Sequence, residues 1–214
     1  LGEALTQKEK KADVLDVNVG LPEIDEPQMM IDVVKELQAV IDLPLQIDTT
    51  NPVAMEKALR IYNGKPMINS VNGKEEIMKE IFPLAKKYGG LIVALTIDES
   101  GIPDTAQGRV EIARKIYARA AEYGIKPKDI IIDPLAMSIS SDPQSAITTL
   151  DALRLIKEQL NGKTSLGVSN ISFGLPQRDF VNASFFTMAM HNGLNAGIMN
   201  PGSLEMMKAY YTYC

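Results

Sequence analysis

The chain has very little of the two residue types that most often carry metal and nucleophilic chemistry. Its 214 residues include one cysteine, Cys214, at the last position, and one histidine, His191. A single cysteine excludes an internal disulfide and a zinc site built from cysteines. A single histidine leaves little room for a histidine-ligated metal or a Ser-His-Asp relay. The chemistry must therefore come mainly from Asp, Asn, Ser, Thr, Arg and Lys, and we expect no metal site.

Positive charge and long apolar runs are also scarce. The chain has 22 Lys and Arg against 27 Asp and Glu, a net charge of -5 at pH 7. This balance argues against nucleic acid as a partner, because a phosphate-binding surface needs clustered Lys and Arg. No apolar run approaches the ~18 residues that a membrane helix needs, and no signal peptide is recognisable. We expect a soluble, cytoplasmic protein that binds neither nucleic acid nor membrane.

Short apolar runs alternate along the chain with longer amphipathic stretches. A hydrophobic share of 45% and a charged share of 23% are typical of a folded protein. The length suits one domain, which we place over residues 1–214. The apolar runs, predicted to be buried parallel strands, are Val14–Val19, Leu43–Ile47, Pro66–Ile68, Leu91–Ile97, Asp129–Ile132, Ser165–Val168 and Ala196–Met199.

Helical spacing of apolar residues fills the stretches between these runs. Glu75–Tyr88 places Ile77, Ile81 and Leu84 on one face and lysines on the other. Asn51 and Pro52 are typical of a helix start, with an N-cap followed by proline in the first turn. The other predicted helices are Leu1–Lys11, Pro27–Ile41, Thr105–Tyr123, Ser145–Leu160, Pro176–Asn192 and Ser203–Tyr213.

The alternation of strands and helices predicts an α/β fold with a parallel sheet and right-handed crossovers. Seven predicted strands stand against eight predicted helices, because the chain opens with a helix. The simplest interpretation is a (β/α)8 TIM barrel whose first strand is missing from this chain. The alternative, an open doubly wound sheet, would need a glycine-rich first turn, and the sequence has no G-x-G-x-x-G motif.

Every predicted strand ends in Asp or Asn, where barrel enzymes carry their active residues. Any one such residue is more often a turn or cap residue. Asn51, however, is placed to cap the next helix, which leaves Asp48 available for the cavity. A ring of carboxylates and amides suits a polar, planar ligand rich in hydrogen-bonding groups. The strand-end residues are Asp16, Asn18, Asp48, Asn69, Asp98, Asp133, Asn170 and Asn200.

Five stretches at these strand ends, in order along the chain, resemble the pterin-binding family. This barrel is shared by cobalamin-dependent methionine synthase and by methyltetrahydrofolate:corrinoid methyltransferases. A single short motif such as Ile-Asp-Pro is weak evidence for a family, whereas five motifs in the same order along the chain are specific. The stretches are Leu15–Gly20 (LDVNVG), Gln46–Asn51 (QIDTTN), Met67–Ser70 (MINS), Ile131–Leu135 (IIDPL) and Leu166–Pro176 (LGVSNISFGLP).

The resemblance implies a methyltransferase of one-carbon metabolism and assigns roles to particular residues. Asn69 and Asp133 would hydrogen-bond the pterin ring, with Asp48 beside them. Asn170 matches the residue that faces N5 and is the expected catalytic residue, and Arg178 matches a further folate contact. Asp16 and Asn18 alternate with apolar neighbours on one strand and are expected to face the same pocket.

The reaction implied is transfer of the N5 methyl group of 5-methyltetrahydrofolate to cob(I)alamin. The cobalamin would be supplied by a partner, a corrinoid-binding domain or protein, and a homodimer is the family expectation. The stretch Ser172–Arg178 most resembles methionine synthase, so the first interpretation is its folate-binding module in methionine biosynthesis.

Three alternatives stay open: a stand-alone methyltetrahydrofolate:corrinoid methyltransferase, a non-catalytic folate-binding module, and dihydropteroate synthase. The last is disfavoured because the synthase carries a basic cluster where this chain reads Ser169-Asn170-Ile171-Ser172, neutral throughout.

Overall fold

The structure is a computed structural model that describes all residues from 1 to 214. Seven parallel strands form one sheet in the order in which they occur in the chain. Each strand pairs in parallel with the next, which confirms the predicted α/β architecture. The strands are β1 (Leu15–Val17), β2 (Leu45–Asp48), β3 (Met67–Asn72), β4 (Leu91–Leu95), β5 (Ile130–Asp133), β6 (Lys163–Gly167) and β7 (Ala196–Ile198).

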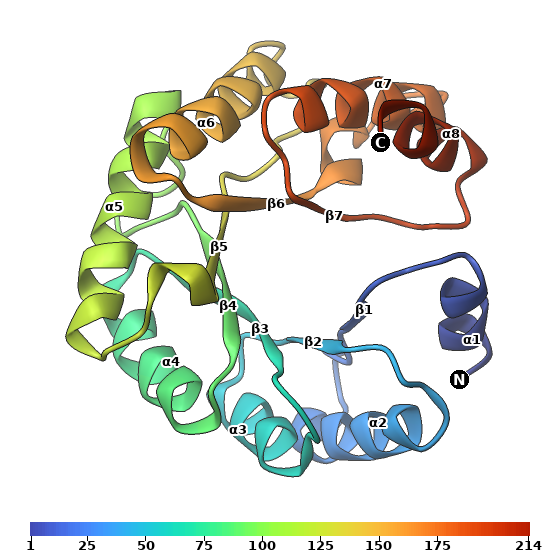
Figure 1. The fold of residues 1–214 in the computed structure, drawn as a ribbon, viewed down its shortest axis with the longest axis vertical. Coiled ribbons are helices and arrows are strands. Elements are labelled where there is room, and N and C mark those ends of the chain that lie inside the picture. Colours follow the sequence, from blue (N-terminus) through green and yellow to red (C-terminus); the bar gives the residue numbers. More distant parts are fainter.

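After the first helix, each α-helix follows a strand, and the helices lie around the outside of the curved sheet (Figure 1). None of them combines the length and the apolar character needed to cross a membrane. Short 3-10 helices precede β5 and follow β6, at Pro127–Asp129 and Val168–Ser172. The α-helices are α1 (Gly2–Glu9), α2 (Glu26–Val40), α3 (Pro52–Ile61), α4 (Glu75–Tyr88), α5 (Ala106–Glu122), α6 (Ser145–Leu160), α7 (Arg178–His191) and α8 (Leu204–Tyr213).

The sheet curls into a barrel that is open between its first and last strands. β1 and β7 are the two edges of the sheet, and α1 and α8 lie on the open side (Figure 1). A cavity of about 540 Å³ lies there, lined by Asp16 and Gln46 on the inside and by Met199 and Tyr210 towards β7 and α8. A closed eight-stranded barrel would need one more strand at this place. The prediction of a TIM barrel without its first strand is confirmed.

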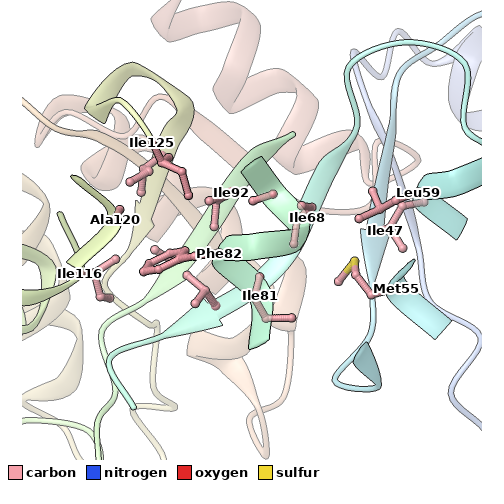
Figure 2. Close-up of a cluster of buried hydrophobic side chains, with 14 of the residues drawn as sticks. Ile47, Met55, Leu59, Ile68, Ile81, Phe82, Ile92, Ile116, Ala120 and Ile125 are labelled. Carbon is pink, nitrogen blue, oxygen red and sulfur yellow. The ribbon is translucent and has the colours of Figure 1, made fainter. Parts of the chain in front are cut away.

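The main hydrophobic core lies between the outer face of the sheet and helices α2 to α5. Ile47, Ile68 and Ile92 project outward from β2, β3 and β4, and all three are fully buried. Figure 2 shows Phe82 of α4 and Ile116 of α5 packed in the same layer. This layer fixes how the strands sit side by side, and therefore where their carboxyl ends meet.

Strand β3 is longer than the predicted run Pro66–Ile68 and extends to Asn72. Polar side chains at Asn69, Ser70 and Asn72 interrupt the apolar pattern, so the sequence alone did not show the extension. The pairing with β4 shifts register between Asn69 and Val71, which marks a bulge at the end of the strand. Such irregularities often redirect a side chain beside a site.

Replacing Phe82 with alanine tests whether this core sets stability. Phe82 is fully buried, and its ring lies 5.5 Å from that of Tyr123. We expect Phe82→Ala to lower the free energy of unfolding by about 3–5 kcal/mol, measured by urea denaturation. Phe180→Ala is the matched control, because Phe180 is 61% exposed. A change for Phe180→Ala as large as that for Phe82→Ala would contradict this assignment of the core.

Candidate active site

The carboxyl ends of the parallel strands bring the predicted residues of β1, β2 and β3 together. The register places Asp16 opposite Gln46, and Asp48 opposite Asn69. Neighbours in register on parallel strands point to the same side of the sheet. The outward side carries the core, so these four side chains belong to the inside of the barrel.

Hydrogen bonds connect these polar side chains. Asn18 Nδ2 donates to Asp48 Oδ2 at 2.9 Å, and Gln46 Nε2 donates to Asp16 Oδ1 at 2.6 Å. The side chain of Asn69 lies near Asp16 and lowers the pKa of that carboxyl group slightly. Asp48 does not cap helix α3. As predicted, Asn51 is the N-cap, and its Oδ1 accepts hydrogen bonds from the amides of Val53 and Ala54.

Both carboxyl groups of this network are harder to ionise than usual. Burial of the carboxyl group raises the pKa of Asp16, although the residue as a whole remains open to solvent. The bond from Gln46 opposes that rise. Burial likewise raises the pKa of Asp48, which Asn18 opposes and the nearby Glu26 reinforces. A ligand that donates N–H groups to these oxygens would favour their charged form.

Asp133 ends β5 and is the most deeply buried of the predicted site residues, at 6% exposure. Its Oδ1 accepts the amide of Leu135 at 2.8 Å. Burial raises the pKa of Asp133 to about 7, while the amides of Leu135 and Gly167 and the charge of Arg109 oppose the rise. A carboxyl group titrating near neutrality in the interior is typical of a functional site.

Asn170 lies in the 3-10 turn that follows β6 and is exposed. Its side chain rests against Gly167, where a Cβ would come within 3.0 Å of Asn170 Nδ2. The amide of Gly167 acts on Asp133 as well. Asp133, at the end of β5, and Asn170, in the turn after β6, therefore both lie next to Gly167.

The side chain of Arg178, the first residue of α7, packs against the loop that carries Asn170. Its Nε donates to Ser172 Oγ at 2.9 Å, and its Nη2 donates to the carbonyl oxygen of Ser169 at 2.9 Å. The guanidinium also stacks over the ring of Phe173, 4.7 Å from its centre. These contacts make Arg178 a support for the loop, and its predicted contact with folate stays a prediction.

Two other strand-end residues have the ordinary role of turn formers. Asp98 Oδ1 accepts the amide of Ser100 at 2.8 Å, and Asn200 Oδ1 accepts the amide of Gly202 at 2.8 Å. Gln46, in contrast, was missed by the sequence analysis, although it is 4% exposed and bound to Asp16. Its position two residues before Asp48 on the same strand was the available signal.

The site offers carboxylates and amides at the ends of several strands, and the chain holds no cluster of three or more His, Cys, Asp or Glu side chains that could bind a metal ion. An ionised carboxylate accepts two parallel N–H bonds, and an amide both donates and accepts. The fold is a parallel α/β barrel, and these residues form a candidate site for a polar ligand at the carboxyl ends of its strands.

Comparison with known proteins identifies the family. The family described as pterin binding enzyme matches residues 1–200, and the chain belongs to it. The methylcorrinoid:tetrahydrofolate methyltransferase of Eubacterium limosum is 32% identical over 216 residues, which is 97% of this chain and 78% of that protein. The methionine synthase of Mycobacterium tuberculosis is 34% identical over 178 residues, which is 77% of this chain and 15% of that protein. The resemblance drawn from the strand ends is confirmed.

Solved structures share the fold at lower identity. The dihydropteroate synthase of Xanthomonas albilineans in complex with 7,8-dihydropteroate superposes with a TM-score of 0.81 at 21% identity, over 99% of this chain and 82% of that chain. A Yersinia pestis dihydropteroate synthase in a sulfonamide drug complex gives a TM-score of 0.80 at 15% identity, over 99% and 82% of the two chains. These matches support the barrel fold.

Asp133→Asn tests whether the buried carboxyl group controls the pH dependence of stability. The native state keeps a proton that the unfolded chain releases above about pH 4, so the wild type loses stability as pH rises from about 4 to 7. The slope from this group is at most about 1.4 kcal/mol per pH unit. We expect the variant, which keeps the acceptor for Leu135, to lack this loss and to be the more stable protein at pH 8 in urea denaturation.

Asp142→Asn is the matched control, because Asp142 Oδ1 also accepts an amide two residues ahead, at 2.9 Å, but is exposed. Its stability should follow that of the wild type from pH 4 to pH 8. A wild type and an Asp133→Asn variant that lose stability in parallel over this range would refute the interpretation.

Proposed function

We propose that this protein catalyses methyl transfer from N5 of 5-methyltetrahydrofolate to a corrinoid held by a partner domain or protein. The observation that carries the proposal is that a buried carboxyl group, Asp133, and an exposed amide, Asn170, both lie next to Gly167. The first can hold the pterin ring, and the second can act at the atom that loses the methyl group.

Asp133 supplies the main anchor for the pterin ring. A pterin edge presents an exocyclic amine and a ring N–H, which an ionised carboxylate can accept side by side. Asp48 and Asn69, adjacent in register on β2 and β3, add acceptors and a donor from the other wall. Several fixed contacts of this kind would orient N5 with little freedom left to the ring.

Asn170 acts at N5. A methyl group on a tertiary amine is a poor electrophile unless the nitrogen gains positive charge. The side-chain oxygen of Asn170 can accept a hydrogen bond from protonated N5 as that charge develops, which stabilises the transition state more than the ground state. The contacts of Arg178 with Ser169 and Ser172 hold the turn that carries this amide.

The corrinoid supplies the cobalt that accepts the methyl group, so the barrel needs no nucleophile of its own. The same site would serve transfer in either direction, because both directions share one transition state. The similarity to the Eubacterium limosum enzyme over 97% of the chain supports a stand-alone methyltransferase, and the similarity to methionine synthase supports a folate module. The proposed chemistry is the same in both settings.

Single-turnover mixing tests the role of Asn170. The protein is mixed with methyltetrahydrofolate and cob(I)alamin, and the cobalamin spectrum is followed. We expect Asn170→Ala to slow methyl transfer by roughly 100-fold, because one hydrogen bond to a developing charge is lost. Binding of methyltetrahydrofolate, measured by calorimetry, should change much less.

Asn63→Ala is the control, because Asn63 is exposed in the loop between α3 and β3, at the other end of the barrel. It should transfer the methyl group at the wild-type rate. A wild type that binds the folate without methylating cobalamin would contradict the proposal in favour of a binding module. Formation of dihydropteroate from a pterin pyrophosphate and p-aminobenzoate would instead favour a synthase.

A further inference from the structure

A buried arginine lies directly behind the pterin-facing end of β5. Arg109, on the first turn of α5, is 3% exposed. Its Nη1 donates to the carbonyl oxygens of Pro134 and Leu135, both at 2.8 Å, and to Thr149 Oγ1 at 3.1 Å. Its Nε donates to the carbonyl oxygen of Pro103 at 3.1 Å. The guanidinium is thus bound mainly by backbone of two loops.

The two carbonyl groups that Arg109 holds belong to the residues that follow Asp133. Leu135 has a φ of 68°, a left-handed conformation that a branched side chain seldom adopts without support. Its amide points to Asp133 Oδ1, and its carbonyl oxygen accepts from both Arg109 and Thr149. By holding the carbonyl group of Leu135, Arg109 and Thr149 therefore also fix the amide of Leu135, which in turn positions Oδ1 of Asp133.

Arg109 also brings a buried positive charge to the back of the site. The charged groups around it are Asp104, in the loop before α5, and Asp133, and each favours the charged guanidinium. The attraction of Arg109 for Asp133 in turn lowers the pKa of that carboxyl group against the larger effect of burial. An arginine remains protonated at any pH of interest, so this charge is constant.

We propose that Arg109 is a positioning residue for the pterin site: it locks the Pro134–Leu135 turn that orients Asp133, and it faces this carboxyl group with a fixed positive charge. The inference rests on the proposed function of Asp133 as the pterin anchor. Lysine could not replace it, because an ammonium group lacks the planar fork that reaches several acceptors at once.

Titration of the Asp133 carboxyl carbon by NMR tests the charge without any ligand. The signal is assigned by its absence in Asp133→Asn. We expect Arg109→Gln to move the midpoint of Asp133 upward by about half a pH unit, because the neutral amide no longer attracts the carboxylate. Arg109→Lys, which keeps the charge, should stay near the wild-type midpoint. An unchanged midpoint in a folded Arg109→Gln protein would overturn this part of the proposal.

Steady-state kinetics of the protein with methyltetrahydrofolate and a corrinoid acceptor tests the positioning. We expect Arg109→Lys to raise KM for methyltetrahydrofolate by about tenfold with kcat nearly retained, since the turn loses its bridge while Asn170 is untouched. Because this variant keeps the charge, it still tests the positioning role if Arg109→Gln fails to fold. A wild-type KM in Arg109→Lys would overturn the positioning role.

Thr149→Val separates these effects from a general loss of packing. Thr149 is fully buried and holds the same Leu135 carbonyl group, but it carries no charge. In Thr149→Val the titration midpoint of Asp133 should equal that of the wild type. A shift as large as in Arg109→Gln would overturn the role of the charge. A wild type that fails to bind the folate would refute the proposed function, whereas the ligand-free titration would still decide the effect of Arg109.

Discussion

A carboxyl group inside a protein is stable in its charged form only if its oxygens are bound, and Asp133 meets this condition in part. The amide of Leu135 occupies one oxygen, and burial still leaves the group with a pKa of about 7. In the ligand-free protein the carboxyl group is therefore balanced between two protonation states. A ligand that offers two parallel N–H groups would favour the charged form of the Asp133 carboxyl group. It would then form strong, charge-assisted hydrogen bonds with that carboxylate. Under the proposed function, this balance would let Asp133 recognise the edge of a pterin ring.

The barrel brings together groups that lie far apart in the chain. Asp16, Asp48 and Asn69 occupy neighbouring strands on one wall. On the other wall, Asp133 ends β5 and Asn170 lies in the turn after β6. The apolar layer outside β1 to β5 sets the positions of the first wall and of Asp133 (Figure 2). A second apolar cluster, which includes Leu166, Val168 and Ile171, holds β6 and the turn that carries Asn170. The opening between β1 and β7 exposes the side of this polar interior nearest to Asp16 and Gln46.

Much of this arrangement could be predicted from the sequence because strand ends follow a simple rule. Alternation of apolar runs and amphipathic stretches indicated the parallel barrel, and the polar residue at each strand end indicated the candidate site. The rule does not separate a ligand-binding Asp from a turn-forming one, so Asp98 was included with Asp133. Arg109 was missed because an arginine in an amphipathic helix normally lies on the surface. Only the packing of α5 against the turn after β5 shows that this one is buried.

The most direct test of the account is the affinity for methyltetrahydrofolate as a function of pH, measured by calorimetry between pH 5.5 and 8.5. If the pterin is held by the ionised form of Asp133, the affinity of the wild type should increase as pH rises through about 7 and then level off. Asp133→Asn should bind weakly, with little change in affinity over the same range. An affinity that is independent of pH in the wild type, or equally strong in Asp133→Asn, would contradict the claim that this carboxylate anchors the pterin.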